Sequence, residues 1–296
     1  MRCADAEFIR ILVPVEFSPR CRGAVQYAEA LACHFHCEIV LLHVVMPPLA
    51  NFTSFEAMAY TSAGDLAREI IEQRTIELEA FSCSVPSDTQ VQRVVLEGDP
   101  TQNIVEYASA EKCDLIVMPT HGYGPFRRFL LGSVAAKVLH DAICPVWTGP
   151  HMERAPDYST VRFQNIVCAI DVGLHSREVL CWAAGFAREF GARLSIVHAI
   201  TSSATRLGGF YFDPDWRTQL TKTAVERIAS FREEMEIEAS VAIEAGETPV
   251  VVTSAVETLN ADLLVIGRGS TPRAHGHLPS NAYAIIRQSS CPVVAV

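Results

Sequence analysis

The chain has 296 residues, of which 49% are hydrophobic and 20% are charged. At about 100–200 residues per domain, this length predicts two domains, and the composition excludes an intrinsically disordered chain. The net charge of −10 argues against broad electrostatic binding to nucleic acid or to an anionic membrane surface.

No apolar run approaches the roughly 20 residues that a membrane span needs. The N-terminus is interrupted by Asp5, Glu7 and Arg10 before an apolar leader could form. We therefore expect a cytoplasmic protein with no membrane or nucleic-acid partner, whose ten cysteines are reduced thiols. The densest cluster of metal-ligand types runs from Cys33 to Cys37, but this segment is typical of a helix end that enters a strand, so we expect no metal site.

Strands and helices alternate along both halves of the chain. In the first half we expect strands at Ile9–Val15, Glu38–Val45, Gln90–Glu97, Leu115–Met118 and Pro145–Thr148, with helices at Cys21–Phe35, about Leu66–Phe81, after Pro100 and at Ser133–Ala142. In the second half we expect strands at Gln164–Ile170, Arg193–Ile200, Ala239–Ala245, Leu263–Ile266 and Pro292–Val296, with helices at Ser176–Phe190, about Trp216–Met235, after Pro249 and before the last strand.

The second half repeats the first. Glu16 and Asp171 follow similar apolar runs and lie 155 residues apart (171 − 16), and His43 and His198 keep the same offset (198 − 43). A Cys-Pro-Val triplet ends each half, and one fold copied twice explains this pattern better than an array of short units. We therefore predict two doubly wound α/β domains, each a Rossmann-like, five-stranded, mostly parallel sheet with helices on both faces, at 1–149 and 164–296, joined by a linker at 150–163.

A loop after the fourth strand of the first half carries the main chemical signal. Gly122 is followed after nine residues by Gly132 and Ser133, where a helix is predicted to begin. Free N–H groups and the helix dipole at such a point favour an anion, and glycine lets a phosphate approach the backbone closely. Plain turn chemistry for the glycines, and a solvated loop for Arg127 and Arg128, are the alternatives. No P-loop, complete dinucleotide fingerprint, nucleophile elbow or metalloprotease motif is present.

With this loop and the repeated motifs, the whole chain resembles a tandem universal stress protein. Nucleotide-binding members of that family carry G-x2-G-x9-G-[S/T]; here Pro119 replaces the first glycine and removes one backbone donor. The resemblance implies an acid after the first strand, here Glu16, near adenine or ribose, and backbone contact at Val44. The full set implied for the first half is Pro14, Val15, Glu16, Val44, Met118, Pro119, His121, Gly122, Gly132, Ser133 and Val134.

The second half departs further from the family motif. Its acid is Asp171, and its loop keeps the spacing but has serine at the second and third glycine positions. Because the Cβ of serine opposes a positive φ, we expect weaker nucleotide binding there. The residues of this weaker site are Asp171, Gly267, Ser270, Ser280 and Asn281, and we expect the nearby His275 and His277 to be exposed loop residues.

The resemblance implies a stress-response regulatory protein that binds ATP, or ADP or AMP, mainly in the N-terminal domain and acts as a nucleotide-dependent switch or adaptor. Mg²⁺ is a candidate companion of the nucleotide. A slow ATPase and a structural adaptor that binds no nucleotide stay open as alternatives, and we assign no catalytic residues. The resemblance also implies that the two domains pair through their last strands. A homodimer and an unidentified protein partner are further expectations.

Overall fold

The computed structural model describes residues 3, 6–46, 63–121, 131–149, 152, 161–201, 214–268 and 280–296. The chain divides into two compact units. The N-terminal unit consists of Phe8–Trp147 and Met152–Val161, and the C-terminal unit consists of Met1–Glu7, Thr148–His151 and Arg162–Val296.

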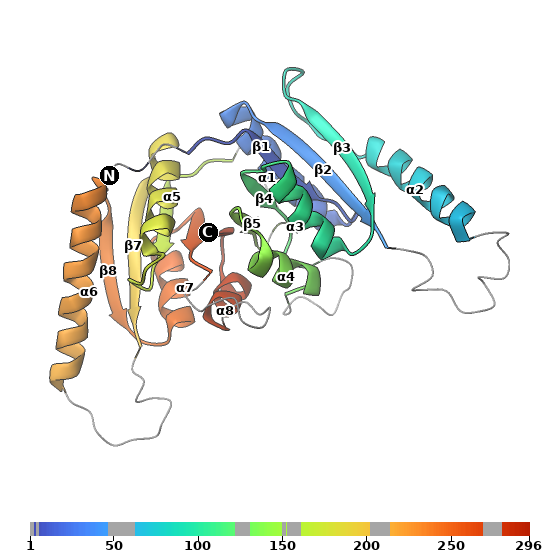
Figure 1. Cartoon of the computed structure of the whole chain (residues 1–296). Coiled ribbons are helices and arrows are strands. Elements are labelled where there is room, and N and C mark those ends of the chain that lie inside the picture. The colour runs from blue at the N-terminus through green and yellow to red at the C-terminus, as the bar shows by residue number, and fades with distance from the viewer. Residues whose placement is uncertain are drawn as a thin grey trace. The chain divides into compact units, whose positions relative to one another are not determined.

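Strands and helices alternate in the first half of the chain as the sequence predicts (Figure 1). The strands are β1 (Arg10–Pro14), β2 (Glu38–Val45), β3 (Val91–Glu97), β4 (Leu115–Val117) and β5 (Val146–Thr148), and the helices are α1 (Pro19–Phe35), α2 (Ala63–Glu79), α3 (Pro100–Ala110) and α4 (Ser133–Asp141).

The second half repeats this order of elements. Its strands are β6 (Asn165–Ala169), β7 (Arg193–Ile200), β8 (Ser240–Ala245), β9 (Leu263–Ile266) and β10 (Val293–Ala295), and its helices are α5 (Ser176–Glu189), α6 (Pro214–Met235), α7 (Thr248–Thr258) and α8 (Ser280–Gln288).

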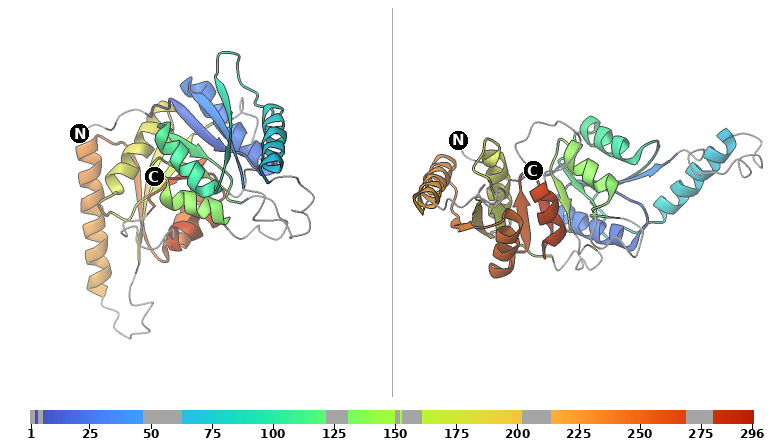
Figure 2. Two further views of the ribbon diagram at one scale, coloured as in Figure 1. Left: turned by 45° about the vertical axis from the view of Figure 1, so that its right-hand side comes forward. Right: turned by 90° about the horizontal axis from the view of Figure 1, so that it is seen from below.

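Both halves have the same sheet topology. The strand order is β3-β2-β1-β4-β5 in the first half and β8-β7-β6-β9-β10 in the second, and the neighbouring strands within each half pair in parallel. Parallel crossovers are right-handed, so connections toward β3 place α1 and α2 on one face and those toward β5 place α3 and α4 on the other. Helices thus cover both faces of each sheet (Figure 2), which confirms the predicted fold class.

The first helix begins two residues earlier than its predicted start at Cys21. Ser18 occupies the N-cap in an extended conformation, and Pro19 follows as the first helical residue. Proline suits this position because its φ is already helical and the N–H it lacks would have no helical partner. The central strand of the first sheet has an apolar middle: Ile11, Leu12 and Val13 of β1 are fully buried, as expected for a parallel strand covered on both faces.

In each half, an aspartate at the same place in the repeat links the amino ends of two neighbouring strands by hydrogen bonds. Oδ2 of Asp114 accepts hydrogen bonds from the backbone N–H groups of Ile9 (2.7 Å) and Arg10 (2.9 Å). Oδ2 of Asp262 accepts in the same way from Gln164 (2.7 Å) and Asn165 (2.8 Å). This pair of repeated acids therefore stabilises the edge of the sheet opposite to the one where parallel sheets bind ligands.

The expectation of ten reduced thiols is wrong for two cysteines. Cys3 and Cys181 form a disulfide with a Cα–Cα distance of 5.0 Å, within the range that this bond requires. Nη2 of Arg188 also donates to the carbonyl oxygen of Cys3 (3.0 Å). The pairing brings together residues 178 positions apart, because the N-terminal segment packs against α5 of the C-terminal unit, a contact that cysteine spacing does not reveal.

We predict that Cys3→Ser lowers the free energy of unfolding of the C-terminal unit by about 2–4 kcal/mol under oxidising conditions, because the disulfide restricts the unfolded chain. Denaturant unfolding with and without reductant measures this effect. Cys33→Ser, which removes a half-buried free thiol, is the matched control. Equal midpoints for wild type and Cys3→Ser without reductant would contradict the prediction.

Candidate functional site

The strand order places a crevice at the carboxyl ends of the central strands. In the first half β1 lies between β2 and β4, and in the second half β6 lies between β7 and β9. The connections that leave the two sides of this central strand run over opposite faces of the sheet, so the segments beyond the strand ends diverge. Ligands of open parallel sheets bind at this point, and the acids predicted from the sequence, Glu16 and Asp171, lie two residues after the ends of β1 and β6.

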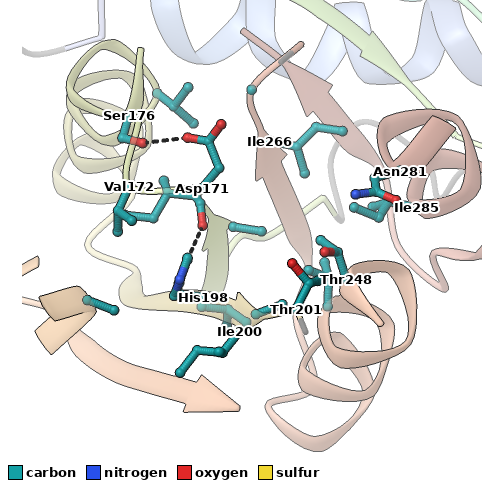
Figure 3. A pocket seen from close by; sticks show the side chains of 18 of the residues that line it. Asp171, Val172, Ser176, His198, Ile200, Thr201, Thr248, Ile266, Asn281 and Ile285 are labelled. Carbon is teal, nitrogen blue, oxygen red and sulfur yellow. Dashed lines mark hydrogen bonds between the residues drawn. The ribbon is translucent and has the colours of Figure 1, made fainter. Parts of the chain in front are cut away.

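The C-terminal unit has a cavity of about 500 Å³ at this point (Figure 3). This volume is in the range of small-molecule sites, about 300–1,000 Å³. Side chains from the ends of β6, β7 and β9 and from α5 to α8 surround it. Its lining includes Asp171, Val172, Ser176, His198, Ala199, Thr201, Thr248, Ile266, Gly267, Asn281 and Ile285.

Asp171 is held in one orientation at this cavity. Its Oδ1 accepts hydrogen bonds from the backbone N–H of Gly173 (2.8 Å) and from the hydroxyl of Ser176 (3.0 Å). A Cβ on residue 173 would lie 2.9 Å from Oδ1 of Asp171, so glycine permits this close approach. Between them, Val172 adopts φ 55°, a left-handed conformation that β-branched residues rarely take and that is typical of functional sites.

A histidine lies beside the acid in both units. Nδ1 of His198 is 2.9 Å from the carbonyl oxygen of Ile170, and Nδ1 of His43 is 2.7 Å from the carbonyl oxygen of Val15. Both rings border a cavity, His198 in the C-terminal unit and His43 in the N-terminal unit. The repeated histidine is thus part of the site, although the residue set predicted from the sequence does not contain it.

Helix N-termini lie on the other side of the C-terminal cavity. Thr248 is the first residue of α7 and Asn281 is the second residue of α8, and Figure 3 shows both across the cavity from Asp171. The side chain of Glu247, at the N-cap of α7, makes no capping hydrogen bond. In the N-terminal unit, by contrast, Asp99 caps α3 by accepting from Gln102 N–H (2.9 Å). The side chain of Glu247 therefore does not cap the N–H groups of the first turn of α7, and Pro249 contributes none.

The N-terminal unit has a cavity of about 440 Å³ at the equivalent strand ends. Phe17 has φ 64°, matching Val172, and its ring centre lies 4.7 Å from that of His43. The guanidinium of Arg74 lies 5.8 Å from the centre of the Phe17 ring. The complete lining is Glu16, Phe17, His43, Val44, Val45, Met46, Ile70 and Arg74.

Glu16 differs from Asp171 in its local partners. Its Oε1 accepts from the hydroxyl of Ser18 (2.8 Å), and Cys21 stands at the position that corresponds to Ser176. The Sγ of Cys21 is 3.2 Å from the Glu16 backbone nitrogen, and burial raises the pKa of this thiol. The acid is thus positioned in both units, but by different side chains.

The backbone of β2 presents hydrogen-bonding groups to the crevice. The carbonyl of Leu42 accepts from Val15 N–H (2.8 Å), so Leu42 turns its peptide groups toward β1. Alternate residues of a parallel strand turn toward the same neighbour, and Val44 is two residues further on, where β1 has already ended. Ala199 has the same place in the C-terminal unit and lines its cavity.

The described ends of the predicted phosphate loop lie close together. Thr120 and His121 are buried after β4, and Gly132 donates its N–H to the carbonyl of Thr120 (2.8 Å). Gly132 is the N-cap of α4, with φ −62°. A Cβ there would lie 3.4 Å from Cα of His121, so glycine suits the close approach of the loop ends rather than a left-handed conformation.

The structure brings only part of the predicted residue set around the two cavities. Glu16 and Val44 line the N-terminal cavity, and Asp171, Gly267 and Asn281 line the C-terminal one. Ser280 begins α8 and Ser133 begins α4, with Val134 next to it. Pro14 ends β1, and Met118 donates its N–H to Trp147 O (3.0 Å) just before the buried Pro119. Gly122, Arg127, Arg128, Ser270, His275 and His277 lie outside the described residues.

The Cys33–Cys37 segment ends α1 and enters β2, as predicted. Burial raises the pKa of the Cys37 thiol to about 12. Within the part of the chain that the structure describes, no group of three His, Cys, Asp or Glu side chains could hold a metal ion. The described helices include none that is both long and apolar enough to cross a membrane.

The pKa of His43 lies below its ordinary value of 6.5, chiefly because burial disfavours the charged ring; the hydrogen bond to Val15 opposes this, and Arg74 adds to it. As the pH falls through 6.5, the unfolded chain binds a proton that the folded chain does not. This contribution to stability is therefore present above about pH 6.5 and is lost on acidification.

We predict that His43→Gln loses less stability than wild type between about pH 7.5 and about pH 5.

Denaturant unfolding across this pH range measures the difference. His36→Asn is the control, because His36 is exposed and its left-handed backbone (φ 54°) suits asparagine. Parallel stability profiles for wild type and His43→Gln would contradict the prediction.

Comparison with known proteins identifies the repeated fold. The model of the universal stress protein family matches residues 7–148 and 162–296. Universal stress protein MJ0531 of Methanocaldococcus jannaschii is 30% identical over 148 residues, which are 49% of this chain and 84% of that protein. A universal stress protein structure from Archaeoglobus fulgidus, at 22% identity, has a TM-score of 0.61 and covers 97% of this chain and 95% of its own.

The structure of PA1789 from Pseudomonas aeruginosa is similar over 98% of this chain and 92% of its own, with a TM-score of 0.63 and 19% identity. These two structural likenesses show the fold. The family match extends over both sequence repeats and both sheets. The chain therefore belongs to the universal stress protein family and carries two copies of its domain.

Proposed function

We propose that this protein is a cytoplasmic regulatory protein of the stress response that binds an adenine nucleotide, ATP or its di- or monophosphate, at the crevices of its two units. One observation supports this proposal above the others. The C-terminal cavity has acceptors, Asp171 and His198, on one side and two helix N-termini on the other. A nucleotide is complementary to this arrangement, because its ribose and base carry hydrogen-bond donors and its phosphates are anionic acceptors.

In this proposal, different residues bind the ribose, the base and the phosphates of the nucleotide. Asp171 or Glu16 accepts from a ribose hydroxyl or from the adenine amine, and the peptide groups of Ala199 or Val44 meet the edge of the base. The N–H groups of Ser133 and Val134, at the start of α4, receive phosphate in the N-terminal unit. Pro119, which lacks an N–H, contributes no donor.

The two sites differ in the strength that we propose for them. The N-terminal unit keeps two of the three motif glycines, Gly122 and Gly132, and is the main site. The C-terminal unit has Ser270 and Ser280 at the corresponding positions and is the weaker one. Mg²⁺, if it accompanies the nucleotide, is expected at the phosphates, whose loops at 122–130 and 269–279 lie outside the described residues.

A bound nucleotide acts as a switch only if two conformations of the protein bind it differently. We propose that it changes the affinity for an unidentified protein partner. Pairing of the two domains through β5 and β10, and formation of a homodimer, stay predictions. A slow ATPase is the alternative within the same site, and release of inorganic phosphate from bound ATP separates it from a switch that does not turn over.

We expect the purified protein to bind ATP with one tight site and one weaker site per chain. Mass spectrometry of ligands released on denaturation, followed by isothermal titration of ATP and Mg²⁺ into ligand-free protein, measures identity and stoichiometry. A phosphate-release assay then measures turnover. Absence of nucleotide after purification, and no heat up to millimolar ATP, would overturn the proposal in favour of the structural adaptor.

Two isosteric substitutions assign the sites. Glu16→Gln is expected to weaken the tight site, and Asp171→Asn the weak site, each by about 10- to 100-fold, because each replaces a charged acceptor with a neutral amide. Glu257→Gln, at an exposed position in the last turn of α7, is the control. Loss of the tight site in Asp171→Asn rather than in Glu16→Gln would reverse the assignment of the two sites.

A further inference from the structure

The two repeated histidines have the same unusual attachment to the sheet. In each unit the ring nitrogen Nδ1 lies within 3 Å of the backbone carbonyl of the residue before the site's acid: His198 on Ile170 at 2.9 Å and His43 on Val15 at 2.7 Å. The carbonyl belongs to the residue that immediately follows β6 or β1. The ring therefore crosses from the end of one strand to the end of its neighbour at the crevice.

This attachment selects one tautomer of the neutral ring. A backbone carbonyl only accepts hydrogen bonds, so Nδ1 must carry the proton and donate it. In the neutral ring Nε2 then has a lone pair and acts as an acceptor. The low pKa of His43, caused chiefly by burial, keeps its ring in this neutral form near neutral pH.

The acceptor atom is available to a ligand. Nε2 of His198 and Nε2 of His43 have no hydrogen-bond partner among the described residues of the protein. Neither atom belongs to the buried polar atoms that lack a partner, so both atoms are accessible. His198 lines the 500 Å³ cavity beside Asp171 and beneath Val172 (Figure 3). In the N-terminal unit the ring of Phe17 packs on His43 at 4.7 Å, whereas the smaller Val172 replaces it in the C-terminal unit.

We infer that Nε2 of His198, and Nε2 of His43 in the other unit, accepts a hydrogen bond from the nucleoside part of the ligand and so selects for a donor there. The donor is a ribose hydroxyl or the exocyclic amine of the base. Together with the neighbouring acid, this histidine gives each site two hydrogen-bond acceptors. This pair favours nucleosides that carry the donor over analogues without it. This inference rests on the proposed function.

Two substitutions separate the acceptor role of Nε2 from the hydrogen bond that Nδ1 makes to Ile170. His198→Asn keeps an N–H near the Nδ1 position, and with it the bond to Ile170, but has no acceptor at the Nε2 position. His198→Gln extends further and places an amide oxygen near the Nε2 position. Corresponding substitutions at His43 test the other unit, and His36→Asn, at the opposite edge of the sheet, is the control.

Isothermal titration of the full-length variants with ATP, 2′-deoxyATP, 3′-deoxyATP and ITP supplies the measurement. We expect His198→Asn to weaken ATP binding at the C-terminal site by about 5- to 10-fold, the effect of one lost hydrogen bond, and His198→Gln to recover part of it. The loss is expected to be absent for the analogue that lacks the donor: a deoxy nucleotide if the donor is a hydroxyl, ITP if it is the amine.

The outcomes distinguish this inference from the proposed function. If the wild type binds none of the four nucleotides, the proposed function fails. If the wild type binds ATP but His198→Asn keeps its affinity, or loses equal affinity for all four nucleotides, the inference is overturned, because the ring then contributes only structure. Thermal unfolding of each variant shows whether the fold is intact, and His198→Gln and the His43 pair supply the test if His198→Asn is unstable.

Discussion

The site in each half depends on the reversal of strand order around its central strand. Because β1 lies between β2 and β4, and β6 lies between β7 and β9, the chain leaves the two sides of the central strand over opposite faces of the sheet. The crevice that results cannot be filled by either helical layer. The acid after the central strand, the histidine of the next strand and the backbone beyond the strand end all face it, so the topology decides where chemistry can occur.

The two units share a backbone and differ in side chains at this crevice. Phe17 and Val172 both adopt left-handed φ values, 64° and 55°, so the turn after the acid is retained although its residue changes from aromatic to aliphatic. Cys21 replaces Ser176 beside the acid, and the hydroxyl that donates to the carboxylate of Glu16 belongs to Ser18 instead. A duplicated fold thus keeps the backbone geometry while the side chains that line the crevice differ between the two copies. The disulfide between Cys3 and Cys181 adds a feature to the C-terminal unit alone.

Most of the fold was predictable because it depends on local patterns. The period of the apolar residues shows where strands and helices alternate, and the repeat shows that one arrangement occurs twice. Element ends were less predictable, as at the start of α1, where Ser18 and Pro19 act together. Of the site, Glu16, Asp171 and Val44 were predicted from resemblance. Phe17, Arg74 and Thr248 were missed, because nothing in their local sequence shows that different helices and turns bring them to one cavity.

The amino-acid order is enough to establish the duplicated parallel α/β fold and the family, since both follow from periodicity and from motifs read along the chain. It also places an acid and a histidine near the end of a strand in each half. Folding in three dimensions was needed for the rest: the tautomer that a neighbouring carbonyl imposes on His198, the uncapped helix end across the cavity from Asp171, and the bond between Cys3 and Cys181. Each of these joins residues distant in the sequence, and such contacts are set by how strands and helices pack rather than by the residues beside them.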